Sequence, residues 1–196
     1  STGGAALRRG SGAGAERGAH GCQRCGEVER CDRVGSLGRR GVFSLTALDA
    51  EFVGAGTGTW PSIAYRLAAA GRIQPDAAQG AEFLWAFGVL VGNSDMHYGN
   101  LSFVSDHGRP YELAPAYDMT PMAFAPNRGG GLPDTLAEAS LHASVANDTW
   151  RRAEALARAF LGRIRATPEF SGRFGPCIAA LEQHLDAARV RIARMG

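Results

Sequence analysis

The sequence contains no lysine, because all 21 of its basic residues are arginines. Lysine is a compact cation that commonly binds phosphate, so no site in this chain can use that contact. Net charge is also small, and a formal value of +2 does not predict nucleic-acid binding. The longest apolar run, residues 83–91, is far shorter than the ~20 residues of a transmembrane helix. We expect neither direct nucleic-acid contact nor a membrane span.

Large aliphatic residues are scarce near the N-terminus. Residues 1–26 consist mainly of Gly, Ala, Arg and Ser, with Leu7 as their one large aliphatic residue. Such a segment buries too little surface to offset its ordering entropy, so we expect a disordered leader. It shows no basic stretch leading into an apolar one, which predicts a cytoplasmic protein with its four cysteines reduced. Residues 27–196 then form one globular domain.

The patterns within this domain predict mostly helices. Ser44 precedes a helical apolar pattern, Thr59 caps the next helix, and Pro75 opens a third with a wide apolar face. The expected elements are a strand at 28–33, helices near 44–52, 59–71, 75–91, 150–164 and 178–192, and a β-hairpin of 101–104 and 111–114. Residues 121–133 are expected to form a long loop. The expected class is therefore α+β, predominantly α.

Candidate chemistry lies in the segment GNSDMHYGN, residues 92–100, and in Asp118 beyond it. An acid is followed by Asn five residues later and by a second acid 23 residues later, which is the spacing of a phosphoryl-transfer site. Asp95 follows a buried helix and can accept a proton from a hydroxyl group. Asn100 and Asp118 offer the oxygen ligands that Mg²⁺ prefers, and the expected hairpin brings them together. These residues predict a base beside a magnesium site.

His97 lies two residues beyond the proposed base, where it can contact a phosphate, orient the base or fill space. Asp and Asn are also common in turns that have no catalytic purpose, which is the alternative for any one of these residues. Three polar groups at these spacings, joined by a hairpin, favour the chemical interpretation.

These motifs resemble the C-terminal lobe of the HipA family of bacterial serine/threonine kinases, the toxins of toxin-antitoxin pairs. The resemblance covers most of residues 27–196, and its anchors are residues 28–33 (VERCDR), 92–100 and 113–118 (LAPAYD). It implies the large lobe of a protein-kinase-like fold with a catalytic β-hairpin. It also implies ATP and Mg²⁺ as cofactors, a protein substrate with a Ser or Thr acceptor, and a DNA-binding antitoxin partner of the HipB type.

The resemblance implies a role for each site residue. Asp95 corresponds to the catalytic base, Asn100 and Asp118 to the magnesium ligands, and His97 to a residue near the nucleotide phosphates. A hinge that contacts adenine through backbone hydrogen bonds corresponds to Glu29 and Cys31.

Two departures from the family pattern affect these expectations. Cys31 stands where the family usually has Phe, which changes packing around the adenine but not the backbone contacts. The family's N-terminal lobe, with its phosphate-covering loop and its Lys, is missing. Because those groups stabilise the transferring phosphoryl group, we expect the chain to be weak or inactive alone.

Three other functions stay open from the sequence. A small-molecule phosphotransferase of the aminoglycoside or choline type usually carries His two residues before the base, where this chain has Asn93. A non-catalytic remnant could act as a binding module through its helices. Metal-dependent hydrolysis by Asp95, His97 and Asp118 is the third alternative.

Overall fold

The computed structural model describes residues 40–126 and 128–195. The expected strand at residues 28–33, the leader and the start of the domain lie outside these described residues. The helices are α1 Leu45–Phe52, α2 Trp60–Ala69, α3 Pro75–Val91, α4 Asn147–Ala166 and α5 Gly175–Ala193. The strands are β1 Gly41–Ser44, β2 Ser102–Ser105 and β3 Glu112–Leu113, and short 3-10 turns are η1 Tyr98–Asn100, η2 Met122–Phe124 and η3 Gly172–Phe174. The prediction of an α+β, predominantly α fold is confirmed.

Capping residues define the first two helices as the sequence predicted. The Ser44 side chain accepts a hydrogen bond from the Ala47 amide, and the Thr59 side chain accepts one from the Ser62 amide. Each bond satisfies an amide that has no partner within its helix. The two predicted starts are therefore confirmed.

A three-stranded antiparallel sheet has the order β1-β2-β3. The predicted hairpin forms, with Phe103 opposite Leu113 and Val104 opposite Glu112. Sequence analysis did not predict β1, which pairs with β2 over four residues and places Phe43 opposite Phe103. The Phe43 ring stacks on Tyr111, with ring centroids 4.4 Å apart. The pairing of β1 with β2 therefore adds a third strand to the hairpin, and this stacking accompanies it.

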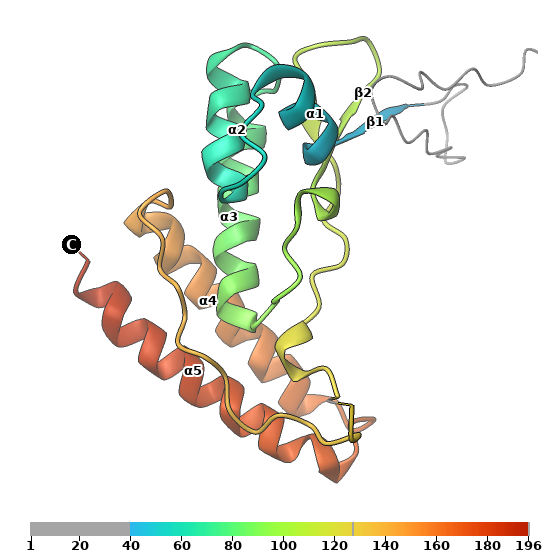
Figure 1. The fold of residues 1–196 in the computed structure, drawn as a ribbon. Coiled ribbons are helices and arrows are strands. Elements are labelled where there is room, and N and C mark those ends of the chain that lie inside the picture. The colour runs from blue at the N-terminus through green and yellow to red at the C-terminus, as the bar shows by residue number, and fades with distance from the viewer. Residues whose placement is uncertain (1–39, 127, 196) are drawn as a thin grey trace, which may run out of the picture.

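Helix α3 is the central element of the fold. In Figure 1 it extends from the end that holds α1 and α2 to the end where α4 crosses it and α5 runs below it. Its first half packs in a core with α1, α2 and the hairpin, around the fully buried Trp60 and Phe103. Its second half packs in another core with α4 and α5, around the fully buried Trp150. The prediction of a central helix is confirmed, and its C-terminal end leads directly into residues 92–100.

Glu82, in the middle of α3, joins three helices. Its carboxylate is buried and accepts hydrogen bonds from the Tyr65 hydroxyl on α2 and from the Ala146 amide at the N-cap of α4. The partial positive charge of a helix N-terminus favours a carboxylate there. Burial and this carboxylate raise the pKa of the Tyr65 hydroxyl to about 12. Glu82 therefore connects the two halves of the core.

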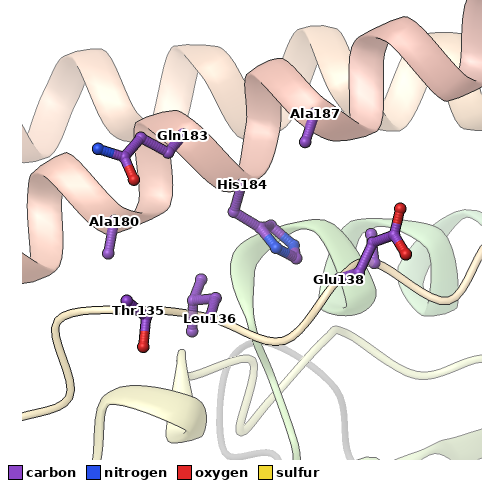
Figure 2. A pocket seen from close by; sticks show the side chains of 8 residues that line it. Thr135, Leu136, Glu138, Ala180, Gln183, His184 and Ala187 are labelled. Atoms are coloured by element: carbon purple, nitrogen blue, oxygen red, sulfur yellow. The ribbon is translucent and has the colours of Figure 1, made fainter.

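A cavity of about 240 Å³ lies between α5 and the extended segment 135–139 (Figure 2). His184 on α5 lines it, and its Nε2 atom lies 3.3 Å from the Val89 carbonyl oxygen on α3. Leu136, on the opposite wall, also lies against Gly92 at the end of α3. The segment 135–139 therefore lies between α5 and the C-terminal end of α3. No helix among residues 40–126 and 128–195 is long and apolar enough to span a membrane.

Candidate active site

The site begins where α3 ends, at Gly92. Its φ of 75° is left-handed, which side chains with a Cβ rarely adopt. A Cβ there would also lie 3.4 Å from the side chains of Ala123 and Leu136. Gly92 therefore allows the chain to turn sharply out of α3 and into the segment that carries the base.

Asp95 has a fixed backbone and a free carboxylate. Its amide donates to Asn93 Oδ1 at 2.9 Å, and its carbonyl oxygen accepts from Asn100 Nδ2 at 2.8 Å. The side chain is 54% exposed. The carboxylate is thus accessible to an incoming hydroxyl group while both of its flanking peptide groups are held.

Asn100 is buried behind Asp95. Its side-chain nitrogen is engaged with the Asp95 carbonyl, which leaves Oδ1 as the atom available to a cation. The backbone N–H of Asn100 donates to the His97 carbonyl oxygen at 3.1 Å within the η1 turn. The η1 turn therefore sets the position of this oxygen relative to the base.

Asp118 follows the second strand of the hairpin and lies close to Asn93. Its carbonyl oxygen accepts from Asn93 Nδ2 at 3.3 Å. The preceding residue, Tyr117, donates its hydroxyl proton to the Gly99 carbonyl at 2.7 Å, so Ser102 Oγ, also at 2.7 Å, is the donor to the Tyr117 oxygen. These contacts place Asp118 beside the 93–100 segment, as the hairpin argument expected.

Asp118 also has unusual backbone geometry. Its φ of 53° makes it the one non-glycine residue of positive φ in the described part of the chain. Asp and Asn tolerate this conformation better than most residues, and it persists where surrounding contacts hold it. The carboxylate is therefore presented from a constrained turn.

His97 lies beside Asp95 but does not hydrogen-bond to it. Its Nδ1 accepts from the Gly99 amide at 2.9 Å, so a neutral ring carries its proton on Nε2, which lies 4.0 Å from Asp95 Oδ1. The His97 side chain is 59% exposed. The backbone carbonyl oxygen of His97 accepts a hydrogen bond from Trp60 Nε1 at 3.1 Å. Helix α2 thus anchors the backbone of His97, while the imidazole N–H faces solvent beside the base.

Gly88 on α3 leaves room for the two loops that carry Asp95 and Asp118. A Cβ at Gly88 would lie within 3.0 Å of the Met96 sulfur and 3.4 Å from the Met119 methyl group. These methionines directly follow Asp95 and Asp118 in the sequence. Sequence analysis did not identify Gly88, because a glycine inside an apolar helix gives no sign of which side chains approach it.

The oxygen atoms of Asn100 and Asp118 are too few to coordinate a metal ion by themselves, but they suit Mg²⁺ that is also bound by water and phosphate. Among the described residues, no three His, Cys, Asp or Glu side chains gather into a metal site. Mg²⁺ usually binds one or two protein oxygens and completes its coordination with water and substrate phosphates. Asn100 Oδ1 and the Asp118 carboxylate fit this pattern. The hinge residues Glu29 and Cys31 lie outside the described residues.

Comparisons with known proteins identify the family of this chain. The model of the HipA-like C-terminal domain family matches residues 16–185. Toxin YjjJ of Escherichia coli K12 is 36% identical over 170 residues, which are 87% of this chain and 38% of that protein. A chain in the solved complex of HipA, HipB and operator DNA from Shewanella oneidensis MR-1 aligns with a TM-score of 0.52 and 20% identity. The alignment covers 83% of this chain and 46% of that one, and at this identity it shows the fold alone.

The chain spans less than half the length of both relatives. The family model nevertheless covers most of its residues, including Asp95, Asn100 and Asp118. This chain belongs to the HipA-like C-terminal domain family.

Proposed function

We propose that this chain is the base-bearing and metal-binding lobe of an ATP- and Mg²⁺-dependent serine/threonine protein kinase of the HipA toxin type. One observation carries the proposal. A continuous set of hydrogen bonds runs from Asn100 through the Asp95 backbone and Asn93 to Asp118. A proton acceptor and two cation ligands are therefore held together although 23 residues separate Asp95 from Asp118.

Each side chain has a separate task in this proposal. The exposed Asp95 carboxylate accepts the proton of the acceptor hydroxyl group. The His97 Nε2–H group lies beside that carboxylate and can donate to a phosphate oxygen. Asn100 and Asp118 hold Mg²⁺, which neutralises charge on the nucleotide phosphates when it is bound. Glu29 and Cys31 are proposed to meet the adenine.

The contacts of Asn93 argue against the small-molecule phosphotransferase alternative. Asn93 occupies the position at which those enzymes usually carry a histidine. Here its side chain is buried, with its oxygen bonded to the Asp95 amide and its nitrogen to the Asp118 carbonyl. It is thus committed to the protein backbone and does not face a substrate.

The proposed kinase depends on groups beyond this chain. The sequence has no Lys to bind the phosphates, and the matched regions make up only 38% and 46% of the two relatives. We propose that a further lobe supplies the phosphate-binding groups and that this chain alone is weak or inactive. A non-catalytic binding module is then the second candidate, because the sequence contains no Lys that could pair with the phosphates.

The partners we propose follow from the same family. The Shewanella oneidensis structure contains HipA with HipB and operator DNA. By extension, this protein pairs with a DNA-binding antitoxin and phosphorylates a Ser or Thr of a protein substrate in the cytoplasm.

Phosphoryl transfer by the intact gene product tests the proposal. Asp95→Asn keeps the size of the side chain and removes the base, so we expect a loss of about 10²-fold or more, with nucleotide binding retained. Asp134→Asn, at an exposed position in the segment between η2 and α4, is the matched control and should keep full activity. Unchanged phosphorylation by Asp95→Asn would show that the base is assigned wrongly.

A further inference from the structure

Asn93 has the contacts of a residue that aligns two parts of one site. It is 4% exposed and follows the last turn of α3, where its own amide donates to the Gly88 carbonyl at 2.8 Å. Its backbone is therefore an extension of the most central helix of the fold. A side chain attached there has a fixed origin.

Both arms of the Asn93 amide are used. Oδ1 accepts from the Asp95 N–H at 2.9 Å, and Nδ2 donates to the Asp118 carbonyl at 3.3 Å. One partner is a backbone donor and the other a backbone acceptor, so the orientation of the amide is determined by chemistry. No side chain of similar size that lacks an amide offers both a donor and an acceptor in this geometry.

The hydrogen bond from Asn93 holds Asp118, which has the most constrained backbone of the loop that carries this proposed metal ligand. Asp118 has a φ of 53°, which is a costly conformation unless neighbouring contacts hold it. Tyr117 is held by the Gly99 carbonyl, and Asp118 itself is held by Asn93. Without the Asn93 bond, the carbonyl of Asp118 loses the contact that ties this residue to α3.

We propose that Asn93 is a positioning residue that sets the Asp118 carboxylate relative to Asp95 and Asn100, and so determines the affinity of the site for a divalent cation with nucleotide. This inference rests on the proposed function. Asn93 itself does not touch the cation, and its effect is exerted through the backbone of Asp118. Contacts that orient a ligand in this way commonly change metal affinity by about 10–100-fold.

Two substitutions separate the two arms of the amide. Asn93→Ala removes both bonds. Asn93→Ser keeps a hydroxyl that can accept from the amide two residues ahead, as Ser does in turns, but it is too short to reach Asp118. Asn93→Ser therefore isolates the bond between α3 and the metal loop.

Binding of Mn²⁺ in the presence of a non-hydrolysable ATP analogue, followed by electron paramagnetic resonance, provides a readout that does not require activity. We expect Asn93→Ser to weaken Mn²⁺ binding about tenfold, and Asn93→Ala at least as much. The control Asn147→Ala, at the start of α4, removes an amide whose oxygen has no hydrogen-bond partner and should bind Mn²⁺ like the unaltered chain.

The outcomes distinguish the two levels of the argument. Mn²⁺ affinity within twofold of the unaltered chain in Asn93→Ser, with or without a lower melting temperature, would overturn the positioning role and leave the proposed function intact. If Asn93→Ala does not fold, Asn93→Ser decides the question. The measurements use the intact gene product, because a further lobe is proposed to supply the phosphate-binding groups. No Mn²⁺ binding by that unaltered protein would overturn the proposed function, and the positioning role with it.

Discussion

Asn100 donates a hydrogen bond from its side-chain nitrogen to the carbonyl oxygen of Asp95, over 2.8 Å. This bond fixes a candidate metal ligand to the backbone of the candidate base. It also determines which atom of the Asn100 amide is free, because the nitrogen is occupied and the oxygen is left for a cation. Two functions of one site are therefore linked through a single buried side chain.

Replacing Asn100 by Asp tests this relationship. The new carboxylate would place an oxygen against the Asp95 carbonyl, so we expect a loss of about 1–3 kcal/mol in the free energy of unfolding. Urea denaturation gives the value. The same amide-to-carboxylate change at the exposed Gln183 should stay within about 0.5 kcal/mol of the unaltered chain. Equal effects at both positions would mean that the Asn100 bond contributes nothing to stability.

Two glycines within helices are predicted to respond differently to alanine. Gly88→Ala inserts a methyl group against the Met96 sulfur and the Met119 methyl group, so these flexible side chains must move and the gain of about 1 kcal/mol in helix propensity is at least partly cancelled. A Cβ at Gly162 in α4 meets nothing within 4 Å, so Gly162→Ala should stabilise the chain by about 0.5–1 kcal/mol. Urea unfolding measures both variants, and equal stabilisation by Gly88→Ala and Gly162→Ala would contradict the close packing of Met96 and Met119 on α3.

Alkaline pH should destabilise the protein through Tyr65. Burial and the hydrogen bond to Glu82 raise its pKa to about 12, above the value near 10 of an unfolded tyrosine. The folded state therefore binds this proton more tightly. The resulting stabilisation is complete below pH 10 and is lost as the pH rises through 12.

The absence of lysine makes this effect measurable, because no Lys titrates in the same range. Burial also raises the pKa of Tyr98, so the difference in tyrosinate absorbance between the unaltered chain and Tyr65→Phe isolates the Tyr65 hydroxyl, which should titrate near pH 12. That variant should lose stability less steeply than the unaltered chain between pH 10 and 12. Identical slopes would argue against the bond between Tyr65 and Glu82.

Local signals explain how much of the fold the sequence predicted. Ser44 and Thr59 mark helix starts through their own side chains, and the residues of the hairpin alternate and turn within a short segment. The strand β1 was missed because it has four residues and owes its pairing to β2, about 60 positions away in the chain. The stacking of Phe43 on Tyr111, which accompanies that pairing, is likewise not visible in a local pattern.

The candidate site divides in the same way. The grouping of Asp95, Asn100 and Asp118 could be predicted from their spacing and the expected hairpin, while their roles in phosphoryl transfer stay predictions. The contacts that hold these residues in place could not be predicted. The two hydrogen bonds of the Asn93 side chain and the approach of Met96 and Met119 to Gly88 depend on tertiary structure. The roles proposed for Glu29 and Cys31 stay predictions, because these residues lie outside the described part of the chain.

The central claim is that Asp118 holds a cation needed for nucleotide binding. Isothermal titration of the chain with Mg²⁺ and ATP tests it most directly, with Asp118→Asn as the variant because Asn tolerates the φ of 53°. We predict measurable binding by the unaltered chain and by Asp134→Asn, and at least tenfold weaker binding by Asp118→Asn. Equal affinity of Asp118→Asn and the unaltered chain, or no binding by either, would contradict the account.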